Sequence, residues 1–247
     1  MTQVVQDAFR RHSKVALQFS GGKDSLAILY LLRDYWQNLT VYFCESGAAL
    51  PETLELVERV KAEVPHFVTV QGRQPTTIQD YGFPSDLVPC VSTLFGRRLA
   101  GDTGVPMNDR YTCCALSIMA PLHERMQADG ITLIIRGQRN SDAQKSPVRS
   151  GMTVEGFEFL LPIEDWTDDQ VFDFLAAEKV EIPRFYRAGM SSAPDCINCT
   201  AWLEHGLPAY LKQFYPDEAA LQALRLEKQA DEITPVYKTI TTAIGRV

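Results

Sequence analysis

Residues 14–32, KVALQFSGGKDSLAILYLL, form the stretch of sequence that decides the fold. Its apolar beginning predicts a buried strand, and its apolar end has the length and composition of a helix. Further strands are predicted at residues 39–43 and 66–70, with a helix between them that begins near Pro51. Because strands and helices alternate at this spacing, we expect βαβ units and a parallel sheet.

The loop inside this stretch reads Ser-Gly-Gly-Lys-Asp-Ser. Gly21 and Gly22 allow backbone N–H groups to approach a ligand closely, and the start of the helix adds the positive end of a dipole, so the loop suits a phosphate group. Three side chains are candidates to donate hydrogen bonds or charge to it: Ser20, Lys23 and Ser25. Asp24 would repel a phosphate, so we expect it to cap the helix or to help hold Mg²⁺. The alternative is an ordinary Gly-Gly turn, which the complete motif between a strand and a helix disfavours.

The second half of the chain continues the same pattern. A strand is predicted at residues 132–135, and a later helix begins with Thr167 as its cap. We interpret Asp165, Asp168 and Asp169 as capping charges at this helix and not as a pair of catalytic carboxylates.

The predicted fold is therefore an α/β fold, with an open, twisted, mainly parallel sheet, helices on both faces, and a smaller cysteine-bearing C-terminal region. We assign residues 1–180 to an α/β domain that carries the glycine loop and residues 181–247 to the C-terminal region. Residues 71–110 are rich in Pro, Gly and Asp and are expected to form a lid-like insertion. A last helix is predicted at residues 217–231, before a short tail.

Composition and charge narrow the classes of function. With 45% hydrophobic and 22% charged residues, the chain of 247 residues is globular and not disordered or a coiled coil. Its formal net charge of -7 argues against broad binding to nucleic acid or membranes. The charge does not exclude a small molecule or a nucleic acid of the size of a tRNA as the acceptor of a transferred group. We see no membrane-spanning stretch and no export signal, so we expect a cytoplasmic protein. Separately, we expect a homo-oligomer.

Six cysteines in a reducing compartment favour metal ligands or redox groups over disulfides. Four of them form two close pairs, the adjacent Cys113 and Cys114 and the Cys-x-x-Cys motif of Cys196 and Cys199. Four thiolates from two short motifs can hold zinc or an iron–sulfur cluster. Adjacent cysteines reach a single tetrahedral zinc poorly, whereas a cubane offers each of them its own iron. We therefore favour a [4Fe–4S] cluster, with zinc or unligated core cysteines as alternatives.

A basic loop follows the strand predicted at residues 132–135. Its four cations are Arg136, Arg139, Lys145 and Arg149. Ligands of open α/β sheets bind at the carboxyl ends of the strands, and arginine suits bidentate contact with phosphate or sulfate. We expect this loop to contact an anion; the alternative is a solvated basic loop.

Several of these motifs resemble known families. Ser-Gly-Gly-Lys-Asp-Ser resembles the PP-loop of the ATP pyrophosphatase superfamily, which cleaves ATP between its α- and β-phosphates to adenylate a substrate. Most of the chain is similar to the adenylylsulfate and phosphoadenylylsulfate reductase branch, and residues 45–53 and 161–171 resemble two of its segments. Gly137, Arg139 and Arg149 resemble its Gly-x-Arg stretch, which holds the anionic part of the nucleotide. The two cysteine pairs resemble the [4Fe–4S] site of adenylylsulfate reductases.

The resemblance implies an adenine nucleotide ligand and two alternative reactions. The first is adenylation of an acceptor by ATP and Mg²⁺, with Lys23, Asp24 and Ser25 as catalytic residues and a sulfur donor such as sulfide or persulfide. The second is a sulfonucleotide reductase, in which a cysteine attacks the sulfate sulfur and thioredoxin releases sulfite. The reductases carry that cysteine in a Glu-Cys-Gly-Leu-His motif, whereas the last cysteine here is Cys199, and their loop departs from Ser-Gly-Gly-Lys-Asp-Ser. We therefore favour adenylation, with a non-catalytic nucleotide and cluster sensor as a third possibility.

Overall fold

The computed structural model describes residues 2–101, 104–142 and 145–246, which form two compact units. The first unit comprises Met1–Glu45, Leu50–Gln71 and Pro121–Arg187, and the second comprises Ser46–Ala49, Gly72–Ala120 and Ala188–Val247. The division predicted at residue 180 stays a prediction. The two units are described separately below.

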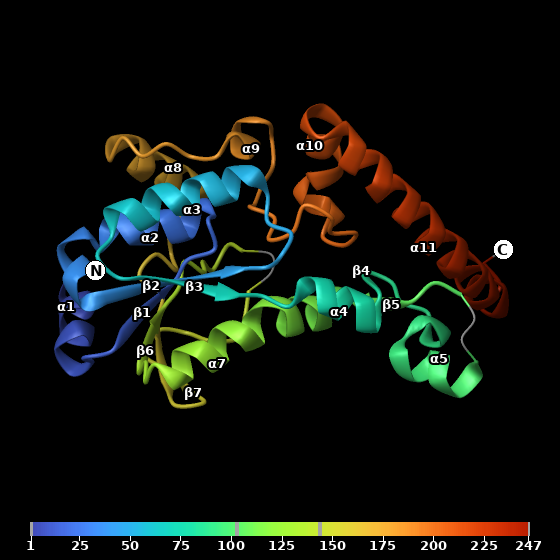
Figure 1. Cartoon of the computed structure of the whole chain (residues 1–247), viewed down its shortest axis with the longest axis horizontal. Coiled ribbons are helices and arrows are strands. Elements are labelled where there is room, and N and C mark those ends of the chain that lie inside the picture. Colours follow the sequence, from blue (N-terminus) through green and yellow to red (C-terminus); the bar gives the residue numbers. More distant parts are fainter. Residues whose placement is uncertain (1, 102–103, 143–144, 247) are drawn as a thin grey trace. The chain divides into compact units, whose positions relative to one another are not determined.

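The first unit is built on a six-stranded sheet with the order β3-β2-β1-β6-β8-β7 (Figure 1). Its strands are β1 (Val15–Gln18), β2 (Leu39–Glu45), β3 (Phe67–Gln71), β6 (Leu133–Ile135), β7 (Thr153–Val154) and β8 (Phe157–Leu160). All neighbouring strands pair in parallel except β7, which is antiparallel to β8. This confirms the predicted mainly parallel α/β sheet.

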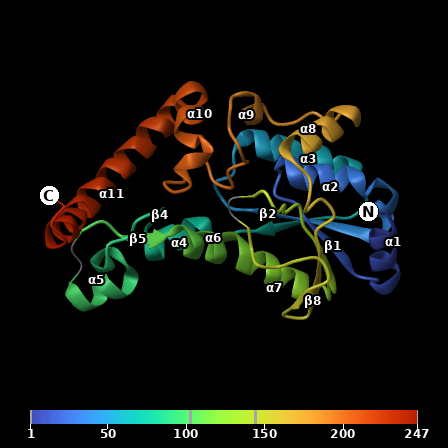
Figure 2. The same ribbon diagram turned by 180° about the vertical axis from the view of Figure 1, so that it is seen from behind.

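Helices cover both faces of this sheet. They are α1 (Thr2–Arg11), α2 (Lys23–Leu31), α3 (Pro51–Glu63), α7 (Ala120–Ala128), α8 (Asp168–Ala177) and the short α9 (Arg184–Arg187). Figures 1 and 2 show α2, α3 and α8 on one face and α7 on the other. The helix α3 begins with Pro51 at its first position, as the sequence predicts.

Alternate residues of the strands supply the two cores. Leu17 and Val41 pack with the core on the α2, α3 and α8 face, whereas Ala16, Tyr42 and Ile134 pack with the core beneath α7. Successive side chains of a strand point to opposite faces, so a strand buried on both sides needs apolar residues at every position. The uninterrupted apolar runs of β1 and β6 follow from this requirement.

The strand order indicates where a ligand could bind. The chain leaves β1 toward β2 on one side and later returns to β6 on the other side of β1. In open α/β sheets, ligands bind at the carboxyl ends of strands where the order reverses in this way. The loop after β1 and the loop after β6 both start at that point.

The second unit contains short elements and one long helix. A two-stranded parallel sheet of β4 (Phe83–Ser85) and β5 (Met107–Asp109) accompanies α4 (Gln74–Tyr81), α5 (Leu94–Ala100), α6 (Arg110–Cys114), η3 (Ala115–Met119), α10 (Leu207–Phe214) and α11 (Pro216–Ala243). The segment predicted as a lid-like insertion thus has its own helices and strands, and its role as a lid stays a prediction.

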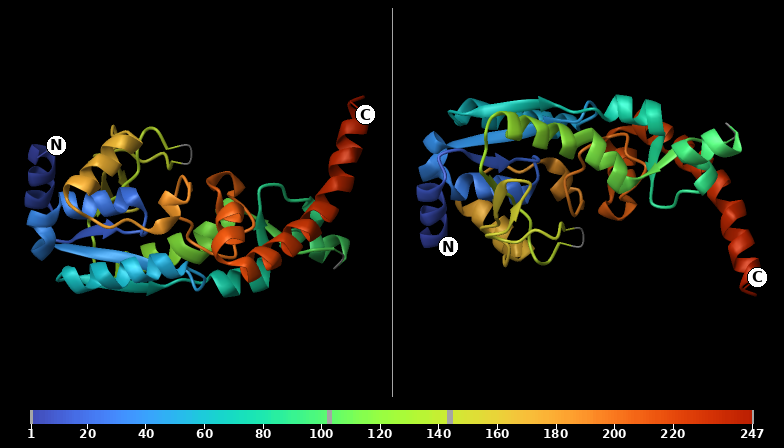
Figure 3. Two further views of the ribbon diagram at one scale, coloured as in Figure 1. Left: turned by 90° about the horizontal axis from the view of Figure 1, so that it is seen from above. Right: turned by 90° about the horizontal axis from the view of Figure 1, so that it is seen from below.

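The helix α11 is longer than predicted (Figure 3). It was expected to end at residue 231, but Ile233, Val236 and Ile240 continue an apolar pattern at helical spacing, and the helix runs through Pro235 to Ala243. The hydroxyl of Thr239 donates to the carbonyl oxygen of Pro235 within this turn.

Candidate functional site

The loop after β1 has the backbone that its glycines allow. Gly21 has a φ of 76°, a left-handed conformation that favours glycine, and a Cβ there would lie 2.7 Å from Cγ2 of Thr53 at the start of α3. Gly22 is the N-cap residue of α2, which begins at Lys23. The predicted strand, glycine loop and helix are therefore present, with the loop packed closely against α3.

The serines of the loop bond to the loop itself. The hydroxyl of Ser25 donates to the carbonyl oxygen of Gly22 at 2.9 Å, and its Oγ lies 3.3 Å from Oγ of Ser20. The backbone N–H of Ser20 also donates to Oγ of Ser25. These contacts stabilise the turn, and a phosphate would have to share Ser20 and Ser25 with it.

Lys23 is buried at the start of α2. Its Nζ lies 2.9 Å from Oδ2 of Asp24 and 3.0 Å from Oδ1 of Asp168. The ammonium is also near the rings of Phe172 and Tyr186, at 6.0 and 5.8 Å from their centroids. The backbone N–H of Lys23 donates to the hydroxyl of Tyr186 at 2.8 Å. Both the charge and the amide that could bind a phosphate thus have partners within the first unit.

Asp24 does not cap α2, contrary to one of the two roles expected for it. The N-cap residue Gly22 has no side chain to form a capping hydrogen bond, and Asp24 instead bridges Lys23 and Arg139, whose Nε lies 2.8 Å from its Oδ1. Burial raises the pKa of Asp24, although both cations act in the opposite direction. Its other expected role, as a ligand of Mg²⁺, stays a prediction.

Gly137 and Arg139 meet the loop from β6. A Cβ on Gly137 would lie 2.7 Å from the carbonyl carbon of Asp24 and 2.8 Å from the backbone nitrogen of Ser25, so only glycine permits this approach. Two residues later, the buried Arg139 places Nη2 at 3.0 Å from Asp142 and 2.9 Å from Asp168. The structure thus brings the first predicted anion-binding segment and the second one together.

We call Lys23, Asp24, Arg139, Asp142 and Asp168 the charge cluster. The pKa of Asp168 is lowered: its partial burial would raise it, but the hydrogen bond and charge of Lys23 and the charge of Arg139 outweigh burial. Asp168 lies in the first turn of α8, as the sequence predicts, and it also pairs with these two cations. Thr167 is the cap of α8, in a capping box with Gln170, and this frees the carboxylate of Asp168 to reach the cations.

Sequence analysis missed three members of this site, Asp142, Asp168 and Tyr186. Asp142 stands three residues after Arg139, a spacing at which opposite charges meet in a turn or helix, and that signal was available. The partners of Tyr186 and Asp168 lie far away in sequence, so no local pattern identifies them.

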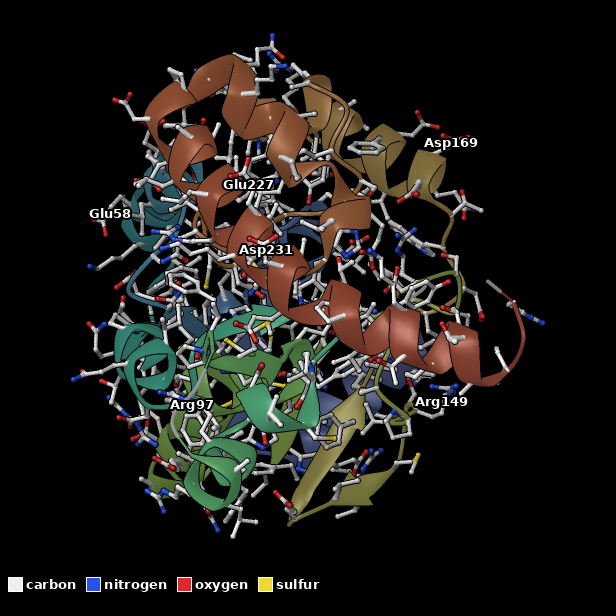
Figure 4. The ribbon with its side chains drawn as sticks, turned by 90° about the vertical axis from the view of Figure 1, so that its right-hand side faces the viewer. Glu58, Arg97, Arg149, Asp169, Glu227 and Asp231 are labelled. Carbon is white, nitrogen blue, oxygen red and sulfur yellow. The ribbon has the colours of Figure 1, made fainter. Side chains whose placement is uncertain are left out.

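The rest of the basic loop does not join the charge cluster. Arg149, labelled in Figure 4, is exposed and donates from Nη1 to the carbonyl oxygen of Val148 at 2.9 Å. Nζ of Lys145 donates to the carbonyl oxygen of Asn140. Burial lowers the pKa of Arg136, which contacts Oγ of Ser146. Of the four cations, Arg139 is the one that the structure places against the loop after β1, through Asp24. A role for Arg149 stays a prediction.

The four paired cysteines all belong to the second unit. Cys113 and Cys114 end α6, and the π-helical turn η3 follows them directly. Cys196 and Cys199 lie in a loop that is tied down by several hydrogen bonds. The hydroxyl of Ser46 donates to the carbonyl oxygen of Asp195, and Nε2 of Gln222 donates to that of Cys199.

The thiols are close enough to influence one another. Burial raises the pKa of Cys114 and of Cys199 to about 12, and that of Cys196 well above its usual value. The neighbouring thiols and the carboxylate of Asp195 add to each of these shifts. Cys113 also acts on Cys199, so the pairs from the two segments face a common region. No disulfide joins any of the six cysteines.

This donor set suits a metal centre, but its side chains are not arranged around one. Among residues 2–101, 104–142 and 145–246, no three Cys, His, Asp or Glu side chains form a group with metal-binding geometry. Neighbouring thiols that oppose one another's ionisation are what a soft cation would stabilise, because it binds the thiolate form. The chemistry of the residues fits, and the thiols would have to turn toward one centre.

No helix in the described part of the chain is long and apolar enough to cross a membrane.

Comparisons with known proteins identify the family that the chain is similar to. Residues 14–202 match the family model of the phosphoadenosine phosphosulfate reductase domain. The phosphoadenosine 5'-phosphosulfate reductase of Gloeobacter violaceus is 26% identical over 204 residues, which cover 78% of this chain and 74% of that protein. The adenosine 5'-phosphosulfate reductase of Allochromatium vinosum is 21% identical over 199 residues, which cover 80% of this chain and 72% of that protein.

A crystal structure shares the fold. The phosphoadenylyl-sulfate reductase of Candida auris, solved as a phosphate complex, aligns with a TM-score of 0.57 at 17% sequence identity. The alignment covers 78% of this chain and 86% of that one. The match confirms the α/β architecture with its mainly parallel sheet.

Proposed function

Because this chain belongs to the phosphoadenosine phosphosulfate reductase domain family, we propose that it binds an adenine sulfonucleotide at the loop of residues 20–25. The observation that carries the proposal is the extent of the match. Residues 14–202 include the glycine loop, Gly137, Arg139 and all four paired cysteines, so the family model spans both candidate sites. The relatives reported above are phosphosulfate reductases by name. Their names favour reduction of a bound sulfonucleotide over cleavage of ATP.

In this function the residues of the first unit bind and orient the nucleotide. Gly21 is left-handed and α2 begins two residues later, a loop and helix start of the kind that suits a phosphate, and Lys23 and Arg139 are buried positive charges that both contact Asp24 of this loop. Reduction of the sulfate group needs two thiols. One attacks the sulfur and releases the adenine nucleotide, and the second displaces sulfite, leaving a disulfide. A thioredoxin-like dithiol is the partner that this chemistry requires.

A second candidate function is supported by the loop itself. Its intact Ser-Gly-Gly-Lys-Asp-Ser motif, with Gly21 in the left-handed conformation, resembles that of enzymes that cleave ATP to AMP and pyrophosphate. Here the loop amides and Lys23, with Mg²⁺ held by Asp24, would stabilise charge on the leaving pyrophosphate. A sulfur donor would then attack the adenylated acceptor and displace AMP.

We also propose that the two cysteine pairs hold a [4Fe–4S] cluster, with zinc as the alternative. Cys113, Cys114, Cys196 and Cys199 would be its ligands, and bound metal would hold them as thiolates and join the segments before and after residue 190. The burial of these thiols and their mutual effect on ionisation support the assignment.

One experiment separates the candidate functions. The anaerobically purified protein is incubated with adenylylsulfate or phosphoadenylylsulfate plus reduced thioredoxin, and separately with ATP and Mg²⁺. We expect sulfite and an adenosine phosphate in the first reactions. AMP and pyrophosphate from ATP, without sulfite, would favour the second candidate. Nucleotide binding without turnover would favour a sensor, and the absence of binding would refute both enzymatic functions.

A further inference from the structure

The position between the two buried cations of the charge cluster is filled by an oxygen of the same chain. Oδ1 of Asp168 lies 3.0 Å from Nζ of Lys23 and 2.9 Å from Nη2 of Arg139. The side chains of Lys23 and Arg139 are only 4% and 5% exposed, so water cannot balance their charges and each needs an anionic partner. A single oxygen shared by an ammonium and a guanidinium is also how a phosphate or sulfate oxygen is held.

Asp168 differs from the other two carboxylates of the charge cluster in its exposure. The side chain of Asp168 is 61% exposed, against 23% for Asp24 and 24% for Asp142. Asp142 also accepts a hydrogen bond from the backbone N–H of Arg139, which ties it to that loop. Asp168 is therefore the carboxylate that can turn into water without leaving a buried position.

The charge balance explains why its departure matters. Lys23 and Arg139 carry two positive charges, and the three aspartates of the charge cluster carry three negative ones, so the cluster has a net charge of -1 while Asp168 is in place. Without Asp168 the remaining charges cancel, and both cations lose one partner. An incoming phosphate or sulfate oxygen can then occupy the position of Oδ1.

We propose that Asp168 is an internal competitor for the anionic group of the nucleotide: its carboxylate occupies the site between Lys23 and Arg139 in the ligand-free protein and is displaced when the nucleotide binds. The inference rests on the proposed function, since it concerns the same loop. It assigns Asp168 a role in selecting ligands. A nucleotide with a phosphate or sulfate group can replace the carboxylate, whereas a neutral nucleoside cannot.

The test compares Asp168→Asn with Asp169→Asn. Asp169 is the next residue of the same helical turn, is exposed and lies outside the charge cluster (Figure 4), so its variant removes one negative charge from the start of α8 without opening the site. Binding of ATP, adenylylsulfate and adenosine to the full chain is measured by calorimetry, with EDTA present to remove divalent cations. Asp168→Ser serves as a second variant, and thermal unfolding shows that each protein is folded.

We expect Asp168→Asn to bind ATP and adenylylsulfate about tenfold more tightly than the natural protein, the gain for a competitor that fills about nine-tenths of the sites. Adenosine affinity should not change, and Asp169→Asn should resemble the natural protein. If the natural protein binds nucleotides and removal of the Asp168 carboxylate leaves their affinity equal or weaker, Asp168 is not a competitor, while the proposed function stands. If none of the proteins binds any nucleotide, the proposed function fails and the inference fails with it.

Discussion

The charge cluster and the cysteine segments differ in how their ionisable groups are balanced. In the first unit, the buried Lys23 and Arg139 are each paired with carboxylates of the same chain. In the second unit, the thiols of Cys114, Cys196 and Cys199 are surrounded by one another and by Asp195, and their pKa values are raised. Both cations of the charge cluster thus have anionic partners within the chain, whereas the thiols lack a cationic partner among the groups that shift their pKa values. If both proposals hold, the charge cluster exchanges one carboxylate for a ligand oxygen, and the cysteine segments gain a metal.

The largest effect is expected from removing one thiol of the second region. Cys196→Ser should lose most of the iron and acid-labile sulfide that the natural protein holds after anaerobic reconstitution, because one of four ligands is missing. Cys90→Ser, at an exposed cysteine outside the two pairs, is the matched control and should retain both. Equal iron content in the two variants would remove the basis for a metal site in this region.

A second effect is expected where the loop after β6 meets α2. Gly137→Ala should lower the free energy of unfolding by about 1–3 kcal/mol, because its Cβ would overlap with backbone atoms of Asp24 and Ser25 that cannot turn aside. It should also weaken nucleotide binding, because Arg139 would be displaced. Urea unfolding and calorimetry measure the two effects. An unchanged stability would show that this close approach is absent in solution.

A third effect is expected at the capping box of α8, the helix that begins with Asp168. Thr167→Ala removes the hydrogen bond that the side chain accepts from the backbone N–H of Gln170 and should cost about 1 kcal/mol of stability. Gln170→Ala removes the reciprocal half of the capping box and should cost less. Urea midpoints of the two variants provide the comparison, and equal midpoints to the natural protein would show that the cap contributes nothing.

The smallest effect is expected at Glu158, a carboxylate of the first unit outside the charge cluster. Glu158 contacts Arg11, the last residue of α1, and His12, which follows it. Partial burial would raise the pKa of Glu158, but its hydrogen bonds to His12 and Arg11 lower it overall. A carboxylate with a lowered pKa stabilises the fold above its unfolded value, 4.5, and loses that contribution as the pH falls through the folded pKa. Thermal unfolding between pH 6 and about 3 should therefore separate the natural protein from Glu158→Gln at the upper end and bring them together at the lower end. A constant difference would contradict the pairing.

The fold was largely predictable because its strongest signals are local. The apolar run of β1, the glycine loop and the helix with Pro51 at its start each lie within one short segment. The sequence analysis does not predict the strand β8. Phe157 and Phe159 begin an apolar run, but the strand has only four residues and Glu158 interrupts the run. Residue 231 was a poor end for α11, since the apolar pattern continues beyond it.

The candidate site was predictable only in part, for a physical reason. The sequence predicts that Gly137 and Arg139 contact an anion, as the loop after β1 would, and the structure brings these two segments together because the carboxyl ends of neighbouring parallel strands meet at one edge. The pairing of Lys23 with Asp168 depends on where α8 starts in space, and a sequence pattern at the helix start indicates only a cap. Local patterns identify groups that can bind a ligand, but not the groups that hold those binding residues while the ligand is away.

The strand order has a consequence for synthesis of the chain. The central strand β1 pairs with β2 early, but its other neighbour, β6, follows a long segment that belongs to the second unit. One edge of β1 therefore stays open on the ribosome until residues 133–135 emerge, and open strand edges are sites of wrong pairing. The glycine loop, which ends β1, can acquire its Arg139 contact only after that late strand has been added. The charge cluster thus forms only after the second half of the polypeptide has been made.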